Sequence, residues 1–498
     1  MTAKARSDLI ISTSLWALLQ IVFIQAGAFV TTMYVTRMLS LNEYGLIPLI
    51  NSMVLLLVVF LGLGLPASLA RFLAGQKTRI GQRQLLVKTG IKVLPLIAVM
   101  GLALYLVYPF LAVMLNEPRL LALKWYFFAI LCLEMIRVFV EKICHGTGTM
   151  KISASLSGWN AIAILCITVP AVWWSPTAAM VVAAKAVGML IPSIRAILSI
   201  RRALSKTKEQ DDIDRQALPR VREVAAYGFP LTIISLSAFG FIQMDIMLLT
   251  YLTDTSTVAL YAVGVLLVMK LTDIARAMGF GVSPQYAKPD CEPAQRLRLY
   301  RSALKYVLVF SLPFAIFLAT FAGDTLNLLF GSKYANAGPS LSMMCLYFLM
   351  ATVLAISSPV LDFGGRAKIR AYAAFSGAAV NIGLNFLLIP RYGALGAAAA
   401  TLCGYSLLFF VTLITVKTML PGKLLSDVGL RRVFFVVTPA FVVLVVACKL
   451  YLDHGFYICM AAMAILYPLA IVKLGIVEKT EVDKVLSFVS RRKASRRG

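Results

Sequence analysis

Charged side chains stand inside apolar stretches of this chain, at spacings that suit the binding of an anion. Lys270, Asp273 and Arg276 lie at i, i+3 and i+6 of one such stretch, so on a helix they spread over one face. An ionisable group near the centre of a membrane span costs about 2.5–3.5 kcal/mol, so we expect these three to face a cavity or each other. Their summed charge is positive, which suits a phosphate group. The alternative is a Lys–Asp–Arg ladder that only neutralises itself.

A second charged face holds more acid than base. Glu134, Arg137 and Glu141 share one side of the apolar stretch at 121–144. Three interpretations stay open for it: an ion-pair network that packs helices together, a cation-coupling site, or a contact with an anionic cargo through Arg137.

Four further charged residues stand singly. Lys185 has no other charged side chain near it in the middle of its apolar stretch, from which it reaches a cavity or the outer interface. Asp245, in QMDIM, has no obvious local partner. Because an unpaired buried carboxylate tends to take up a proton or bind a cation, Asp245 is the first candidate for ion coupling. Arg37 and Arg71 lie near span ends, where such side chains normally extend to the lipid head groups, and a role as gate or cargo contacts is the alternative.

Uncharged polar side chains at mid-depth could bond the hydroxyl groups of a sugar. Hydrogen bonding between neighbouring helices explains them equally well. The candidates are Gln20, Gln25, Asn160, Asn381 and Asn385.

No motif predicts a metal site or a catalytic centre. The eight cysteines show no CxxC spacing, and His145 and His454 fall at opposite membrane faces. A membrane glycan polymerase would need an acidic pair on an external loop, yet the first outside turn, LSLNEYG, offers only Glu43. We therefore expect no enzyme activity, no metal and no cofactor.

The elements that must position these residues are membrane-spanning helices. The chain is 60% hydrophobic and only 14% charged, against about 25% charged in soluble proteins, and its mean hydropathy is +0.85. Nothing at the N-terminus resembles a cleavable signal, so we expect the first helix to stay in the membrane. About fourteen spans are predicted, at 9–36, 46–74, 86–115, 121–144, 152–174, 177–200, 224–252, 258–282, 303–330, 341–363, 369–389, 393–416, 433–452 and 456–472.

The distribution of basic residues predicts the orientation. The chain has 48 Lys and Arg residues, and only six of them lie in the odd-numbered connections between predicted spans. Most of the others lie in the even-numbered connections and the two tails. By the positive-inside rule both termini are cytoplasmic. The net charge of +26 then reflects topology and attraction to anionic lipids rather than binding of nucleic acid.

A long internal repeat predicts two copies of a multi-helix unit. GLGLPA at 62–67 returns as GFGVSP at 279–284, and HGTGTMK at 145–151 returns as DFGGRAK at 362–368, both at an offset of 217. Two six-helix lobes of the same orientation would be related by an axis along the membrane normal. The glycines and prolines of the first pair could let two rocking lobes bend at an inner gate, with simple packing as the alternative. These residues are Gly62, Gly64, Pro66, Gly279, Gly281 and Pro284.

The predicted organisation has five parts. An N-terminal lobe covers 1–205 and a C-terminal lobe covers 223–420, with a polar cytoplasmic linker at 206–222 between them. An appended helix pair follows at 421–475, and a basic cytoplasmic tail at 476–498. The fold class is thus an all-α integral membrane protein with two pseudo-symmetric lobes.

Two phrases carry a family resemblance. The stretch LSLNEYGLIPLINSMVLLLVVFLGLGLPASLARFLA at 40–74 and the stretch AVNIGLNFLLIPRYGALGAAAATLCGY at 379–405 resemble the polysaccharide-exporter branch of the multidrug/oligosaccharidyl-lipid/polysaccharide (MOP) superfamily, the Wzx-type flippases. The helix count and repeat layout extend this resemblance over the whole chain, and two helices beyond twelve are similar to the lipid II flippases, where the extra pair contributes a groove for the lipid tail.

The resemblance implies a flippase of the bacterial inner membrane. Its cargo would be an undecaprenyl-(pyro)phosphate-linked oligosaccharide, turned from the cytoplasmic to the periplasmic leaflet by alternating access. The expected partners are this cargo, membrane lipids and the polymerase and chain-length proteins of the same pathway, around a monomer. The candidate driving forces are a gradient of Na⁺ or H⁺ and the membrane potential. A multidrug antiporter of the same superfamily is the alternative function.

Overall fold

The described part of the chain is entirely helical. The computed structural model describes residues 25–76, 78–205, 218–239, 241, 243–286, 292–422, 424 and 428–473, and it contains no strand among them. In this part, ten helices are long and apolar enough to cross a membrane. The predicted all-α, multi-pass membrane fold is therefore confirmed, while the count of fourteen spans stays a prediction.

Contacts along the backbone divide the chain into two compact units. Unit 1 comprises Met1–Ala262 with Ile389–Gly393, and unit 2 comprises Val263–Leu388 with Ala394–Gly498. Unit 1 thus includes two helices that follow the proposed linker. Most of that linker, at 206–217, and the basic tail lie outside the described residues, so the lobe boundaries stay predictions.

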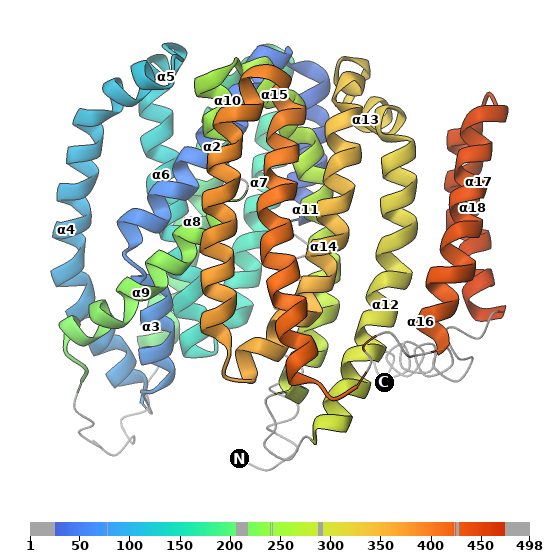
Figure 1. Ribbon diagram of the computed structural model, residues 1–498. Helices are drawn as coiled ribbons and strands as arrows, with labels where there is room; N and C mark the ends of the chain where they lie inside the picture. Colours follow the sequence, from blue (N-terminus) through green and yellow to red (C-terminus); the bar gives the residue numbers. More distant parts are fainter. Residues whose placement is uncertain are drawn as a thin grey trace, which may run out of the picture. The chain divides into compact units, whose positions relative to one another are not determined.

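Unit 1 is a helical bundle that begins with a helical segment at residues 25–38 (Figure 1). Its further helices are α2 (Leu41–Gly62), α3 (Leu65–Ala74), α4 (Arg79–Met114), α5 (Arg119–Ala122), α6 (Lys124–Thr147), α7 (Met150–Trp174), α8 (Ala178–Ser205), α9 (Val221–Phe239), α10 (Gln243–Leu252) and the first turns of α11 (Thr255–Tyr286). Local capping sets several starts: the Ser40 hydroxyl accepts a hydrogen bond from the Glu43 backbone N–H at α2, and the Thr78 hydroxyl does so from Gly81 at α4.

Unit 2 contains the rest of α11 and the helices up to the end of the described chain, apart from residues 389–393 of α15, which belong to unit 1. These are α12 (Pro293–Thr320), α13 (Ala322–Phe330), a 3₁₀ segment at Ser332–Ala337, α14 (Gly338–Phe363), α15 (Ala367–Met419), α16 (Val428–Arg432), a π-helical turn at Val433–Val437, α17 (Thr438–Tyr451) and α18 (Gly455–Lys473). At Gly393 the backbone of α15 leaves helical geometry, with φ 53° and ψ −127°. The IPRYG phrase therefore marks a sharp kink between two helical arms, close to the predicted boundary between the spans 369–389 and 393–416.

The phrase GLGLPA forms a break between two helices. Leu63 and Gly64 both have left-handed backbone conformations, with φ 46° and 66°, and α3 then starts with Pro66 in its first turn. A side chain on Gly64 would collide with the Gly228 carbonyl of α9, since a Cβ atom there would lie 2.0 Å from that oxygen. The predicted span at 46–74 is thus two helices, whose break lies against α9.

The phrase GFGVSP behaves differently from its first copy. Residues 279–284 lie inside α11, which continues without a break to Tyr286. The first copy of the phrase is therefore a helix break and the second lies within a helix, and the role of both as gate bends stays a prediction. In the first copy the break lies where the backbone comes against Gly228 of α9.

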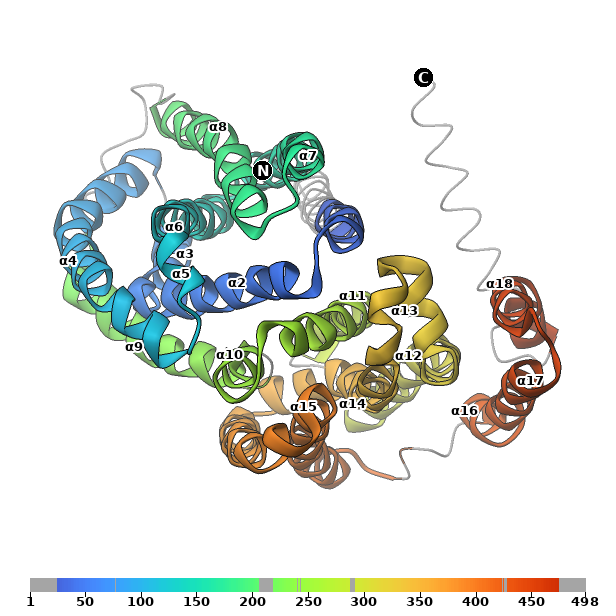
Figure 2. The same ribbon diagram turned by 90° about the horizontal axis from the view of Figure 1, so that it is seen from above.

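The appended helices α17 and α18 form an antiparallel hairpin in unit 2 (Figure 2). They pack on α12: the Tyr467 hydroxyl donates to the Val309 carbonyl at 2.7 Å, and the Lys449 ammonium donates to the Thr320 carbonyl. Phe456 stacks near Phe317, with ring centroids 5.5 Å apart. The hairpin is therefore anchored to the unit along its length rather than attached only through the chain.

Candidate functional site

A network of charged side chains joins α6, α8 and α2 within unit 1. The Arg137 guanidinium lies 2.5 Å from the Glu134 carboxylate and 3.4 Å from that of Glu141. The Lys185 ammonium, from α8, lies 3.5 Å from Glu134 and donates a hydrogen bond of 2.8 Å to the Asn51 side chain of α2. Side chains of α6 and α8 thus meet at the Glu134 carboxylate, and Asn51 of α2 joins them through Lys185. We name these five residues the Glu134 network.

The Glu134 network has as many basic as acidic groups. Two carboxylates face one guanidinium and one ammonium, so the formal charges of these five residues cancel, and the Lys142 ammonium lies a further 3.6 Å from Glu141. Lys185 stands singly along the sequence, but the tertiary fold brings α8 against α6 and gives it Glu134 as a partner, which sequence spacing cannot show. Of the three interpretations left open for Glu134, Arg137 and Glu141, an ion-pair network that packs helices agrees best with these contacts.

The charged stripe of α11 lies in unit 2. The Arg276 guanidinium is 3.3 Å from the Asp273 carboxylate, and Lys270 stands half-buried about one turn earlier. The Arg276 side chain is 46% exposed, which leaves much of its guanidinium open to other partners. The predicted stripe of two cations and one carboxylate is thus present on one helix.

Asp245 has a partner that the sequence analysis did not find. The Tyr261 hydroxyl, from the start of α11, donates a 2.6 Å hydrogen bond to the Asp245 carboxylate, and both side chains are almost fully buried. The two residues are 16 positions apart in sequence and lie on different helices, so they meet only because the chain turns between α10 and α11. Next to Asp245, the Gln243 side chain accepts a 2.6 Å hydrogen bond from the Ser52 hydroxyl of α2.

A second cluster of polar side chains ties together chain segments at the ends of α2, α5, α8 and α11. Arg119 contacts both oxygens of Glu117, at 2.7 and 2.8 Å, and donates to the Thr255 hydroxyl at 2.9 Å. Its guanidinium also lies 3.6 Å from Glu43, whose carboxylate accepts a hydrogen bond from the Ala178 backbone N–H. We call this group the Arg119 cluster.

The Arg119 cluster lies outside the predicted spans, on the side that the positive-inside rule assigns to the exterior. The hydrogen bond to Glu117 and the attraction of Glu117 and Glu43 raise the pKa of Arg119, against the opposing effect of its burial. Backbones meet closely beside it, since a Cβ atom on Gly45 would lie 1.8 Å from the Thr255 carbonyl oxygen. The cluster therefore holds the starts of α2 and α11 together at this end of unit 1.

The three asparagines predicted as polar cavity residues are all buried. Asn381 donates to the Thr401 hydroxyl at 3.3 Å across the two arms of α15, and Asn385 donates to Asn381 at 3.4 Å; both are fully buried. Asn160 is 6% exposed, and neither amide atom has a hydrogen-bond partner among the described residues. The helix-packing explanation therefore fits Asn381 and Asn385 better than a contact with sugar.

Arg71 and Arg37 are both exposed, as their places near the predicted span ends suggest. The Arg71 guanidinium stacks on the Tyr227 ring at 4.2 Å from its centroid. Gln25 is half-buried in the first helical segment, and Gln20 lies outside the described residues.

Sequence reasoning missed several partners that now matter. Asn51, Tyr261, Glu117 and Arg119 were not singled out as site residues, and Glu43 was considered only as an external acid. Tyr261 did carry a signal, because Tyr44 and Tyr261 match at the offset of 217. The others stand in ordinary sequence surroundings, and only the fold identifies them. Within the described residues no group of side chains could hold a metal ion.

Comparison with known proteins identifies relatives of this chain. Residues 11–283 match the model of a family described as polysaccharide biosynthesis protein. An uncharacterized membrane protein of Methanocaldococcus jannaschii is 26% identical over 287 residues, which is 55% of this chain and 54% of that protein, so the match spans only about half the length of this relative.

Solved structures show the same fold at low identity. The lipid II flippase MurJ in an inward closed conformation superposes with a TM-score of 0.70 and 16% identity, over 92% of this chain and 97% of that one. An inward-facing multidrug resistance MATE family transporter of the MOP superfamily superposes with a TM-score of 0.59 and 15% identity, over 81% and 97% of the two chains. The predicted MATE/MOP-like fold is therefore confirmed.

Proposed function

This chain belongs to the family of polysaccharide biosynthesis proteins, with the fold of MOP-superfamily transporters, and we propose that it is a flippase for an undecaprenyl-(pyro)phosphate-linked oligosaccharide. The repeat unit of an O-antigen, capsule or exopolysaccharide is the proposed cargo. It would move from the cytoplasmic to the outer leaflet by alternating access of a central cavity.

The observation that carries this proposal is the charged stripe of α11. Lys270 and Arg276 bring two cations into an apolar helix, and the carboxylate of Asp273 cancels only one of them. A glycan phosphate cannot cross hydrocarbon unaided, because its charges and hydroxyl groups lose hydration. Cations held at membrane depth would replace part of that hydration. The Glu134 network supports the proposal less, since its own charges cancel.

Asp245 and Tyr261 are the proposed place of ion coupling. A carboxylate that is fully buried in the bilayer is stabilised by protonation or by a cation, and the Tyr261 hydroxyl can donate to it when it is charged. Replacing Asp245 with Asn should therefore remove the dependence of transport on a gradient of Na⁺ or H⁺, while Tyr261→Phe should weaken it. Unchanged gradient dependence in Asp245→Asn would shift coupling to another residue or to the membrane potential.

The proposed setting is the bacterial inner membrane, with both termini in the cytoplasm. Membrane lipids and the polymerase and chain-length proteins of the pathway are the proposed partners of a monomeric flippase.

Exchange of Lys270 tests the proposal. In cells whose surface glycan depends on this protein, Lys270→Ala should prevent glycan assembly at normal protein levels, and Lys270→Arg should restore part of it by keeping the charge. Arg298→Ala removes an exposed cation of α12 and is the matched control, which should leave assembly unchanged.

The double variant Lys270→Ala with Asp273→Ala separates cargo binding from charge balance. If the stripe binds the cargo phosphate, the double variant stays inactive. Normal assembly by the double variant would show that Lys270 only balances Asp273. Resistance to cationic drugs that depends on this protein, without any effect on surface glycan, would instead favour the multidrug antiporter.

A further inference from the structure

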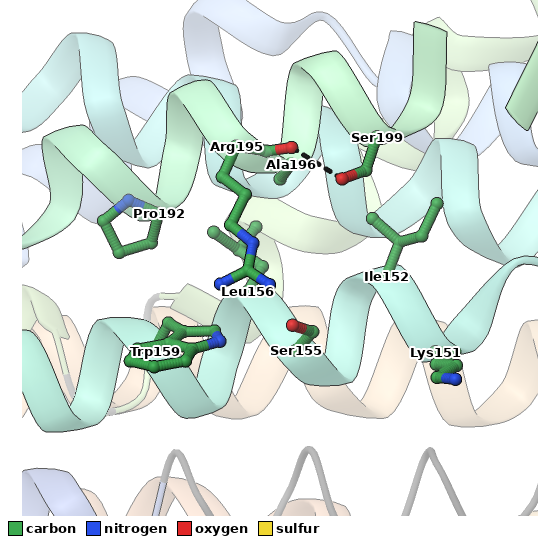
Figure 3. Close-up of a pocket in the computed structure, with 9 residues that line it drawn as sticks. All are labelled: Lys151, Ile152, Ser155, Leu156, Trp159, Pro192, Arg195, Ala196 and Ser199. Atoms are coloured by element: carbon green, nitrogen blue, oxygen red, sulfur yellow. Dashed lines mark hydrogen bonds between the residues drawn. The ribbon is translucent and has the colours of Figure 1, made fainter. Parts of the chain in front are cut away.

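A groove between α7 and α8 is lined by chemistry that none of the preceding sites uses. It encloses about 170 Å³ in unit 1, and its floor contains the buried side chains of Leu156 and Ala196 (Figure 3). Arg195 of α8 and Trp159 of α7 form its polar wall, with the guanidinium carbon 5.3 Å from the centroid of the indole ring. Figure 3 shows the Arg195 side chain extending from α8 across the groove toward α7.

Arg195 brings an uncompensated positive charge to this groove. Within the described residues, no carboxylate forms an ion pair with it, and its side chain contacts the face of the Trp159 ring. The Ser155 hydroxyl stands on the α7 side, and the Ser199 hydroxyl donates to the backbone carbonyl of Arg195 at 2.8 Å. A guanidinium beside a serine hydroxyl and an indole N–H offers several donors to one phosphate.

The surroundings of the groove are apolar and exposed. On α8 the side chains of Val187, Ile191 and Ile194 are 55%, 73% and 49% exposed. In a multi-pass membrane protein such a face meets lipid tails, so an occupant reaches the groove from the bilayer rather than from water. Trp159 itself is 48% exposed, as expected of an indole at a membrane interface.

The depth of Arg195 agrees with the level of lipid head groups. Arg201 and Arg202 continue α8 beyond it, and at 1.5 Å per residue Arg195 lies about 9 Å below Arg201. A long side chain at that depth can extend to the boundary between head groups and tails. The basic end of α8 marks this side as cytoplasmic by the positive-inside rule.

We propose that the α7–α8 groove is a binding site for the phosphate head group of an anionic phospholipid of the cytoplasmic leaflet. The volume favours this occupant over a glycan cargo, because about 170 Å³ is below the 300–1,000 Å³ that hold a whole drug-sized ligand. A head-group phosphate fits against Arg195 while its acyl chains run along the exposed apolar face of α8. The site does not depend on the transport function proposed above.

The test measures lipid retained by the full-length protein. The protein is placed in nanodiscs of equal parts phosphatidylglycerol and phosphatidylcholine, extracted gently, and its bound lipids are counted by native mass spectrometry. We expect preferential retention of phosphatidylglycerol, with at least about a tenfold lower affinity in Arg195→Ala, because a charge-assisted hydrogen bond is lost. Arg195→Lys should keep an intermediate affinity, and Trp159→Leu should weaken it.

Matched controls decide the outcome. Arg202→Ala removes a cation at the same end of α8 but outside the groove, and it should retain phosphatidylglycerol as the native protein does. Equal retention by Arg195→Ala and the native protein would overturn the site, as would an equal loss in Arg202→Ala. Displacement of the lipid by inorganic phosphate alone would show a site for free phosphate. Tighter binding of undecaprenyl phosphate would assign the groove to the cargo; either result overturns the phospholipid site.

Discussion

Charged residues inside the predicted spans are stabilised here by partners from their own helix and from other helices. Glu134 receives both Arg137 of its own helix and Lys185 of α8, while Asp245 receives the hydroxyl of Tyr261. A buried charge without a partner costs far more than a mismatched apolar contact, so each of these pairs constrains how the helices can pack.

Removing Lys185 should destabilise unit 1 measurably. Lys185→Met leaves Glu134 with Arg137 alone and Asn51 without its donor, so we expect the free energy of unfolding to fall by about 1–3 kcal/mol. Adding Glu134→Gln should recover part of this loss, which a double-mutant cycle of denaturation in detergent measures. Lys142→Met, which removes a half-exposed partner of Glu141, is the control and should cost under about 1 kcal/mol. Strictly additive losses would contradict a coupled pair.

Asp254 should make stability depend on acidity at the start of α11. Its burial alone would raise the pKa of the carboxyl, but hydrogen bonds from Thr257 and Ser256 outweigh that effect and lower the pKa. A lowered folded-state pKa means that the stabilisation is complete above the ordinary pKa of about 4 and is lost as the pH falls through the folded value.

Asp254→Asn tests this dependence because the amide oxygen can still cap the helix. As the pH is lowered from 5 to 3, the melting temperature of the native protein should fall more than that of the variant. The same slope in both proteins would exclude Asp254 as the titrating group.

At the scale of elements, breaks in helices decide which segments touch. The break between α2 and α3 lies against α9, and the kink at Gly393 folds α15 back on itself. The Arg119 cluster acts at the other end of α2, where it connects α2 with α5, α8 and α11. The long apolar runs therefore behave as shorter pieces with defined contacts.

Gly64→Ala should damage the fold far more than an alanine in an open helix. Its left-handed backbone costs about 1–2 kcal/mol for a residue with a Cβ, and the new atom would also meet the Gly228 carbonyl. Gly101→Ala in α4 is the matched control, because no atom lies within 4 Å of its Cβ position. We expect the control to be neutral or slightly stabilising. Folded yield after purification and melting temperature report both, and equal behaviour would contradict the close packing of the break.

At the scale of the whole molecule, the appended hairpin is the part without a counterpart in the repeat. The π-helical turn before α17 and the end of α18 bury apolar residues against α12, where Val433, Val437 and Ile471 join one core with Leu304 and Leu308. Hydrocarbon can replace such contacts, since lipid tails are as apolar as a leucine side chain.

Deletion of residues 430–498 should therefore leave a protein that still inserts into the membrane. We expect glycan export to be lost, because we infer that the hairpin shapes a groove for the lipid tail. A protein lacking only 476–498 is the control and should export normally. Membrane-fraction immunoblots measure insertion, and surface glycan measures export. Full export by the longer deletion would make the hairpin a structural or partner-binding accessory.

The sequence by itself determined the class of this protein. Apolar runs of span length are local patterns, and they predicted an all-helical membrane protein correctly, while the resemblance of the phrases at 40–74 and 379–405 pointed to the MOP type. The charged faces of α6 and α11 were also predicted, because i, i+3 and i+4 spacing determines which side chains share a helix face.

Only the tertiary structure decided the partners of those charges. Lys185 and Glu134 are 51 residues apart, and Asp245 meets Tyr261 only through the turn between α10 and α11. Likewise, one glycine phrase became a helix break and its repeat stayed helical, since the break depends on an approach to Gly228 that no local pattern encodes. Helix geometry follows from neighbours in sequence, whereas pairing and bending follow from neighbours in space.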